Sequence, residues 1–133
     1  MKCPQCQGIL VTLEFNRIEI DYCTRCEGIW LDFGELRLLL AQGEKGDSLL
    51  RTMTPARSKE KKRRCPICSK GMGEILIGDG GSILLDECPE HGMWFDRGEL
   101  VKVLEAGCAD SLKHARASSL LQLLDEVFTL CKE

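Results

Sequence analysis

The sequence predicts a small, metal-stabilised α+β fold made of two similar units and a C-terminal helix. The stretch "CEGIWLDFGEL" from Cys26 is nearly repeated as "EHGMWFDRGEL" from Glu90, and six of the nine cysteines stand in Cys-x-x-Cys pairs. The chain also has only seven aromatic residues among 133. Units of about forty residues bury too little apolar surface to fold alone, so metal binding is expected to supply the missing stability.

The cellular compartment decides how the cysteines are interpreted. The chain opens Met1-Lys2-Cys3-Pro4 without an apolar signal segment, and no run is long enough to span a bilayer. We therefore expect a cytoplasmic protein without membrane association. Thiols stay reduced there, which favours metal ligands over disulfides.

The first predicted ligand set combines two cysteine pairs separated by sixteen residues. This spacing is typical of a four-cysteine zinc ribbon, in which two knuckles flank a β-hairpin. The expected ligands of one Zn²⁺ are Cys3, Cys6, Cys23 and Cys26.

The second set has the same plan, with an imidazole in place of the fourth thiolate and a gap of nineteen residues. Three thiolates and one imidazole make an equally good tetrahedral zinc set. Counted from the tryptophan, His91 aligns with Glu27 rather than Cys26, and the longer imidazole is expected to bridge the difference. The ligands of the second Zn²⁺ are therefore Cys65, Cys68, Cys88 and His91.

The donor sets favour a structural role for the metal. A four-cysteine set alone would also suit a rubredoxin-like iron centre, so iron electron transfer stays open as an alternative, whereas a set with histidine favours zinc. Four protein ligands leave no position for substrate, and the sequence shows no nucleophile. We therefore predict two Zn²⁺, no catalytic residues and no enzyme.

A β-hairpin is predicted between the cysteine pairs of each unit. In the first unit Ile18, Ile20 and Tyr22 alternate with acidic residues after a turn at Asn16. In the second unit "EILI" and "ILLDE" flank the glycine-rich residues 78–81. A phosphate-binding loop is the alternative for those glycines, but the Lys and Ser/Thr spacing of a P-loop is missing.

Each second cysteine pair is followed by a predicted helix with a capping box. Asp32 is expected to cap the first helix, with Glu35 three residues on. Asp96 and Glu99 repeat this arrangement in the second unit.

Two more residue types recur around these caps. Trp30 and Trp94 are expected to cover the metal knuckle and join it to the helix. Gly34 and Gly98 fall in the first helical turn, where glycine weakens a helix by up to about 1 kcal/mol relative to Ala. Their recurrence predicts close backbone packing, beneath the tryptophan ring.

Together these motifs resemble the transcription-factor zinc-finger family, the TFIIB-type zinc ribbons common in small bacterial proteins. The shared pattern is a Cys-Pro-x-Cys knuckle, a hairpin, then Cys-x-x-Cys or Cys-x-x-His followed by Gly-x-Trp-Leu-Asp-x-Gly-Glu-Leu. Both copies match, with Phe95 as a departure in the second. The resemblance implies zinc on both ligand sets and, through the family name, a role related to transcription.

A basic segment separates two acidic parts of the chain. Residues 51–64 carry a net charge of +6, against −3 before them and −6 after them. Such a segment is typical either of a solvated linker or of a nucleic-acid contact, because Lys and Arg release counterions on binding phosphates. The candidate nucleic-acid contacts are Lys61, Lys62, Arg63 and Arg64.

The remaining residues from about Ala109 to Cys131 predict a helix with one apolar face. It is expected to pack on the ribbons or on a second chain, which leaves a homodimer open. The predicted divisions are a first ribbon with helix at 1–43, a basic linker at 44–64, a second ribbon with helix at 65–107, and a C-terminal helix at 108–133. The leading functional hypothesis is a non-enzymatic interaction module whose partner is a protein.

Overall fold

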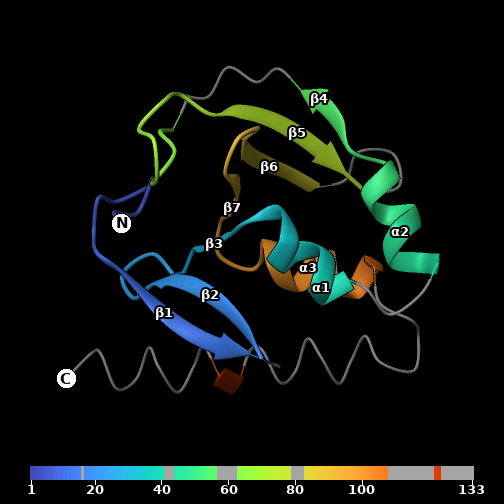
Figure 1. The fold of residues 1–133 in the computed structure, drawn as a ribbon, viewed down its shortest axis with the longest axis horizontal. Coiled ribbons are helices and arrows are strands. Elements are labelled where there is room, and N and C mark those ends of the chain that lie inside the picture. The colour runs from blue at the N-terminus through green and yellow to red at the C-terminus, as the bar shows by residue number, and fades with distance from the viewer. Residues whose placement is uncertain (16, 41–43, 57–62, 79–82, 108–121, 124–133) are drawn as a thin grey trace.

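The computed structural model describes residues 1–15, 17–40, 44–56, 63–78, 83–107 and 122–123. Within them lie seven strands and three helices (Figure 1). In chain order these are β1 (Leu10–Phe15), β2 (Ile18–Cys23), β3 (Ile29–Leu31), α1 (Phe33–Leu40), α2 (Glu44–Arg51), β4 (Thr54–Ala56), β5 (Gly73–Ile77), β6 (Ile83–Cys88), β7 (Gly92–Phe95) and α3 (Glu99–Gly107). The predicted combination of small hairpins and short helices is therefore confirmed.

One antiparallel sheet runs through both ribbons, in the order β1-β2-β3-β7-β6-β5-β4. Its centre is the pairing of β3 with β7, the equivalent strands of the two repeats. Trp30 lies opposite Trp94, with Ile29 opposite Phe95 and Leu31 opposite Met93. The two ribbons are thus related by an approximate two-fold axis near the tryptophans.

Both predicted hairpins form. Phe15 pairs with Ile18 across a two-residue turn in which Arg17 has a φ of 65°. Ile77 pairs with Ile83 at the longer, glycine-rich turn of the second hairpin. Isolated bridges from Lys2 to Ile9 and from Arg64 to Gly71 close the knuckles that precede β1 and β5.

The strands β3 and β7 were not predicted, because their residues are apolar without a polar alternation. Their side chains nevertheless alternate between two apolar clusters. Trp30 packs with the cysteines, whereas Ile29 and Leu31 on either side pack in the main core. Successive side chains of a strand point to opposite faces of the sheet, and here both faces are buried.

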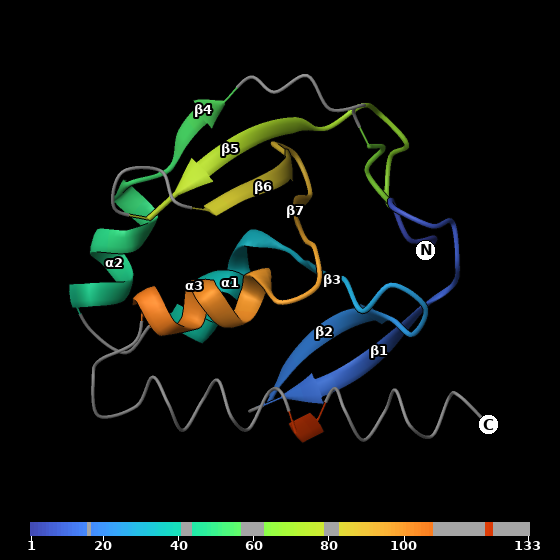
Figure 2. The ribbon, with the colours of Figure 1, turned by 180° about the vertical axis from the view of Figure 1, so that it is seen from behind.

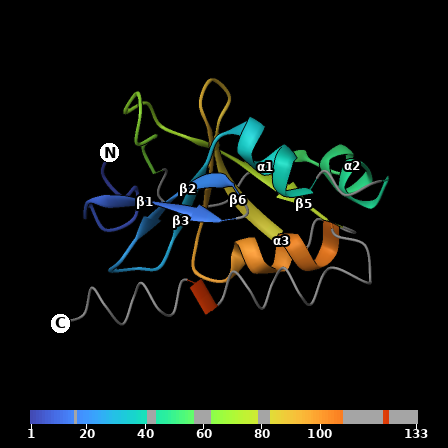
Figure 3. The ribbon, with the colours of Figure 1, turned by 60° about the horizontal axis from the view of Figure 1, so that its bottom comes forward.

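The helices cover the core face of the sheet. In Figures 1 and 2 the two hairpins diverge from β3 and β7, and α1 and α3 lie between them. Figure 3 confirms that α1, α2 and α3 gather away from the N-terminal knuckle. The main core beneath α1 and α3 consists of apolar residues from both repeats, including Leu36, Leu39, Leu100, Val103 and Leu104.

The first capping box forms as predicted. The N–H of Glu35 donates to Asp32 Oδ1 over 2.7 Å, and the N–H of Asp32 donates to Glu35 Oε1 over 2.9 Å. The second box forms only in part: the N–H of Asp96 donates to Glu99 Oε2 over 2.9 Å, but the N–H of Glu99 donates to the Asp96 carbonyl oxygen.

The prediction for the two glycines in these caps was wrong. Gly98 has a φ of +81° and precedes α3, and a Cβ there would meet no atom within 4 Å. A Cβ on Gly34 would meet only Asp32 Oδ1, at 3.4 Å. Gly98 therefore adopts a left-handed backbone conformation, and the helix begins only at Glu99. Neither glycine lies beneath a tryptophan ring.

Two elements that the sequence did not reveal lie within residues 44–64. The strand β4 pairs with β5, placing Pro55 opposite Ile75 on the edge of the sheet. In α2, Leu49 is buried in the main core. Thr52 then links α2 to the end of β5, because its Oγ1 donates to the Leu49 carbonyl and accepts from the N–H of Gly78.

Of the predicted C-terminal helix the structure describes Gln122 and Leu123, both helical. Leu123 is partly buried and packs against the main core. This part of the helix therefore contacts the ribbons of its own chain.

Candidate metal centres

Backbone turns shape three of the four knuckles in the same way. The N–H of Gln7 donates to the Cys3 carbonyl, and Glu27 and Ser69 repeat this bond four residues after Cys23 and Cys65. The donor residue has a φ of 63–65° in all three. The repeated turn brings the two cysteines of each pair to the same side of the backbone.

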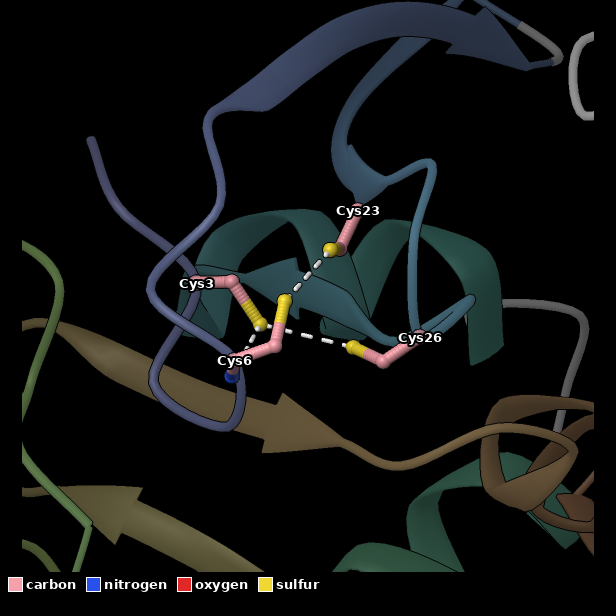
Figure 4. A group of neighbouring side chains, drawn as sticks. All are labelled: Cys3, Cys6, Cys23 and Cys26. Carbon is pink, nitrogen blue, oxygen red and sulfur yellow. Dashed lines mark hydrogen bonds between the residues drawn. The ribbon is translucent and has the colours of Figure 1, made fainter. Parts of the chain in front are cut away.

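The first set converges on one point (Figure 4). The sulfur atoms of Cys3 and Cys26 lie 3.4 Å apart, as do those of Cys6 and Cys23. All four sulfur atoms lie within 4.8 Å of one another. Cys3 Sγ also accepts from the N–H groups of Gln5 and Cys6, at 3.3 and 3.4 Å.

The second set converges equally, with the imidazole turned inward. His91 Nδ1 lies 3.5 Å from Cys88 Sγ and 3.8 Å from Cys65 Sγ, and the sulfur atoms of Cys68 and Cys88 are 3.8 Å apart. Here the fourth knuckle is one residue shorter, and the N–H of His91 donates to the Cys88 carbonyl. The sequence does not indicate which ring nitrogen of His91 faces the cysteines, and the structure shows that it is Nδ1.

Both sets fit a tetrahedral metal ion. Zn–S bonds of about 2.3 Å in a tetrahedron separate two sulfur atoms by about 3.8 Å. Five of the donor pairs are separated by 3.4–3.8 Å, close to that value, and all donors of each set lie within 4.8 Å of one another. Each set offers four soft or borderline donors, the number that completes a structural zinc site.

The pKa values of the cysteine thiols are shifted in different directions by their surroundings. Burial raises the pKa of Cys3 to about 11 and that of Cys65 also to about 11. The N–H of Lys70 is the main cause that lowers the pKa of Cys68 to about 7. A metal ion must therefore displace protons from the buried thiols, which makes its affinity dependent on pH.

The two centres share one apolar cluster, which contains both tryptophans. It comprises Cys3, Cys23, Trp30, Cys65, Met72, Cys88 and Trp94. The tryptophans are 1% and 0% exposed. The predicted position of both tryptophans over the metal knuckles therefore agrees with the structure.

Close packing across the two-fold axis depends on a different pair of glycines. A Cβ on Gly28 would overlap the indole ring of Trp94, which belongs to the other repeat. A Cβ on Gly92 would meet the backbone of Leu31 and Asp32, and Gly92 has a φ of +152°. The repeats thus require glycine two residues before each tryptophan, where the two ribbons cross.

A family model describes both copies. The model for the transcription factor zinc-finger matches residues 2–42 and 64–106, each of which contains one complete donor set. The chain belongs to the transcription factor zinc-finger family. No curated protein and no solved structure matches the chain.

In this zinc-finger chain the second copy uses its capping aspartate differently. The Asp96 carboxylate accepts from Trp94 Nε1 over 3.1 Å and forms an ion pair with Arg63. Arg63 also pairs with Asp86 over 3.2 Å. These bonds tie the start of the second zinc finger to its helix cap and to β6.

The four basic candidates do not form one described surface. Arg63 is partly buried in the ion pairs just described, and Arg64 is exposed beside the knuckle of Cys65 and Cys68. Lys61 and Lys62 lie outside the described residues. A further ion pair between Glu27 and Arg97, at 2.9 Å, joins the two zinc fingers at the surface.

Proposed function

We propose that the chain is a non-enzymatic zinc protein whose two structural ribbons form one interaction module for a macromolecular partner. The observation that carries the proposal is the pair of closed four-donor sets, built into a single sheet and a shared apolar cluster. The family assignment supports zinc as the metal. Sites of this kind hold a scaffold together and leave recognition to its surface.

The proposed ligands follow the donor sets. One Zn²⁺ is held by Cys3, Cys6, Cys23 and Cys26, and the other by Cys65, Cys68, Cys88 and His91, through Nδ1. Bound zinc supplies cross-links between the two knuckles of each ribbon. The protein contributes buried thiols, N–H donors to sulfur and the tryptophans that cover the clusters.

Three properties of the sites argue against catalysis. Each set has four protein donors, so no position is left for water or substrate. Two donors of each set are buried. The capping carboxylates are occupied by the helix N-terminal N–H groups and by Arg63.

The donor chemistry also favours zinc over rubredoxin-like iron. A rubredoxin-like centre requires four thiolates, whereas His91 replaces one of them in the second set. Iron electron transfer therefore ranks below a structural zinc role for the chain as a whole.

A protein partner is favoured over nucleic acid. Arg63, one of the four basic candidates, already neutralises two carboxylates of its own chain. A cavity lies between Lys2 and Arg64, and no aromatic residue in its lining offers a face for stacking a base. The family name makes a protein of the transcription apparatus the first partner to test.

The proposal places the chain in the reducing cytoplasm, where thiols remain available to metal. Within the described ranges, no helix is long and apolar enough to cross a membrane. A homodimer through residues 108–133 stays a prediction. Comparing the sedimentation of the full chain with that of a chain ending at Gly107 tests it, since an unchanged oligomeric state would exclude this helix as the dimer contact.

Elemental analysis with a visible absorption spectrum tests the metal assignment, on protein purified without added metal. We expect two zinc ions per chain and a colourless protein. Cys26→Ser and His91→Ala should each reduce the content to about one zinc, because each removes one of four ligands. Stoichiometric iron with visible absorption would overturn the proposal.

A further inference from the structure

A cavity lies where the first knuckles of the two repeats meet. Its volume is about 390 Å³, near the lower end of the range of about 300–1,000 Å³ that is typical of ligand pockets. In Figures 1 and 2 the N-terminal segment lies beside the loop that follows residue 63. The cavity therefore exists only because the sheet brings the repeats together.

Its walls reproduce the two-fold relation of the ribbons. The lining residues occur in pairs 62 positions apart: Lys2 with Arg64, Pro4 with Pro66 and Gln7 with Ser69. Lys2 and Arg64 lie on the bridged segments that close the two knuckles. Each repeat thus contributes one cation, one proline and one polar side chain to the same cavity.

The charged side chains that line the cavity, apart from the metal ligands, are basic, whereas the ribbons are acidic. No acidic residue lines it, although the parts of the chain on either side of residues 51–64 carry net charges of −3 and −6. The first cysteines of both donor sets border it, but their sulfur atoms accept from backbone N–H groups of Gln5, Cys6 and Ile67. With Zn²⁺ bound, the four-thiolate set keeps a net charge of −2 and the three-thiolate set −1, but Cys3 and Cys65 are buried. The exposed charges of the lining are therefore those of Lys2 and Arg64.

We infer that this cavity binds an acidic peptide segment of a partner protein, with carboxylates on Lys2 and Arg64 and the peptide stem on the partly exposed Pro66. A guanidinium is suited to bidentate carboxylate contacts. A cavity of this size takes a few side chains, not a folded domain. Nucleic acid is disfavoured because two cations and no aromatic ring give neither a phosphate track nor a stacking platform. The inference rests on the proposed interaction module and names its surface.

Fluorescence anisotropy of labelled peptides on the zinc-loaded full chain tests this inference. The probe is a peptide of about ten residues alternating Glu and Gly, and a Gln/Gly peptide is its neutral counterpart. We expect salt-sensitive binding of the Glu peptide and at least about tenfold weaker binding of the Gln peptide.

Charge variants locate the contact. Lys2→Glu with Arg64→Glu should weaken binding of the Glu peptide by about tenfold or more. The matched control reverses two exposed charges on α1 and α3, Arg37→Glu with Lys102→Glu, and should change binding less than about twofold. If the cavity variant loses zinc, Lys2→Gln with Arg64→Gln replaces it, because neutral side chains avoid placing carboxylates beside thiolates.

Three outcomes would overturn the inference. The first is that the Glu peptide does not bind. The second is that the cavity variant and the control variant lose equal amounts of binding. The third is that an oligothymidine probe binds more tightly than the peptide and that the cavity variant loses this binding. Zinc content is measured on every sample. A full zinc load with no peptide binding contradicts the cavity alone, whereas absent zinc contradicts the proposed function.

Discussion

Trp30 on β3 and Trp94 on β7 stand directly opposite each other in the central strand pair, and both are fully buried among the cysteines of the two metal centres. Neither centre therefore has an apolar shell of its own. Structural change at one centre must disturb packing at the other, because the same two indole rings cover both.

Metal loss is expected to be cooperative for this reason. When the zinc-loaded chain is partly stripped with a chelator, native mass spectrometry should show fewer molecules with one zinc ion than two independent sites would give. A dominant species with one zinc ion would contradict the coupling. His91→Ala provides the reference spectrum of a chain with one intact donor set.

Gly28→Ala should destabilise the chain by about 1–3 kcal/mol, because the added Cβ overlaps the Trp94 ring in a packed cluster. Denaturant unfolding at a fixed zinc concentration measures the change. The control is Gly73→Ala in β5, where a Cβ meets no atom within 4 Å. It should alter the free energy of unfolding by less than about 0.5 kcal/mol, and equal effects would refute the packing argument.

Arg63→Met should cost about 1–2 kcal/mol, since it leaves the partly buried Asp86 and Asp96 carboxylates without their counter-charge. The matched control breaks an exposed ion pair. Lys70→Met removes the partner of Glu90, with side chains 70% and 64% exposed, and should change stability by less than about 0.5 kcal/mol. A loss as small as that of the control would show Arg63 to be dispensable.

Glu99 is expected to make stability depend on pH. Burial raises its pKa from 4.5 to about 7, so the folded chain binds this proton more tightly than the unfolded chain. The contribution is fully present below about pH 4.5 and is lost as the pH rises through about 7. Glu99→Gln should therefore flatten the decline in stability between about pH 4.5 and about 7 in thermal unfolding. The control is Glu105→Gln, which removes an exposed carboxylate from the same helix.

Tyr22→Phe should leave stability unchanged or raise it by up to about 1 kcal/mol. Within the described part of the chain its buried hydroxyl has no hydrogen-bond partner. Thr52→Val is the contrasting case, because the Thr52 hydroxyl both donates to Leu49 and accepts from Gly78. That variant should lose about 1–2 kcal/mol, and a larger loss for Tyr22→Phe in chemical denaturation would disprove the argument.

The hairpins and the first helix cap were readable from the sequence because their signals are local. Alternation around Ile20, the turn after Phe15 and the spacing of Asp32 and Glu35 all act within a few residues. The convergence of each donor set followed from the same local order of knuckle, hairpin and knuckle.

Features that depend on contact between the repeats could not be predicted from the sequence. The pairing of β3 with β7 leaves no polar alternation, because both faces are covered, and the strand β4 is defined by its partner β5. Likewise, Asp96 looked like a second copy of Asp32, but Arg63 from the preceding segment engages its carboxylate. The roles of Gly28 and Gly92 depend on atoms of the opposite repeat.

The antiparallel pairing of β3 with β7 has the form of a dimer contact enclosed within one polypeptide. Between separate chains such a contact is symmetric by necessity, and its formation depends on protein concentration. A covalent connection removes both conditions, because the halves meet at a fixed effective concentration. Each half can then diverge without its partner repeating the change, as a histidine in only one donor set and an arginine anchor at only one helix cap illustrate.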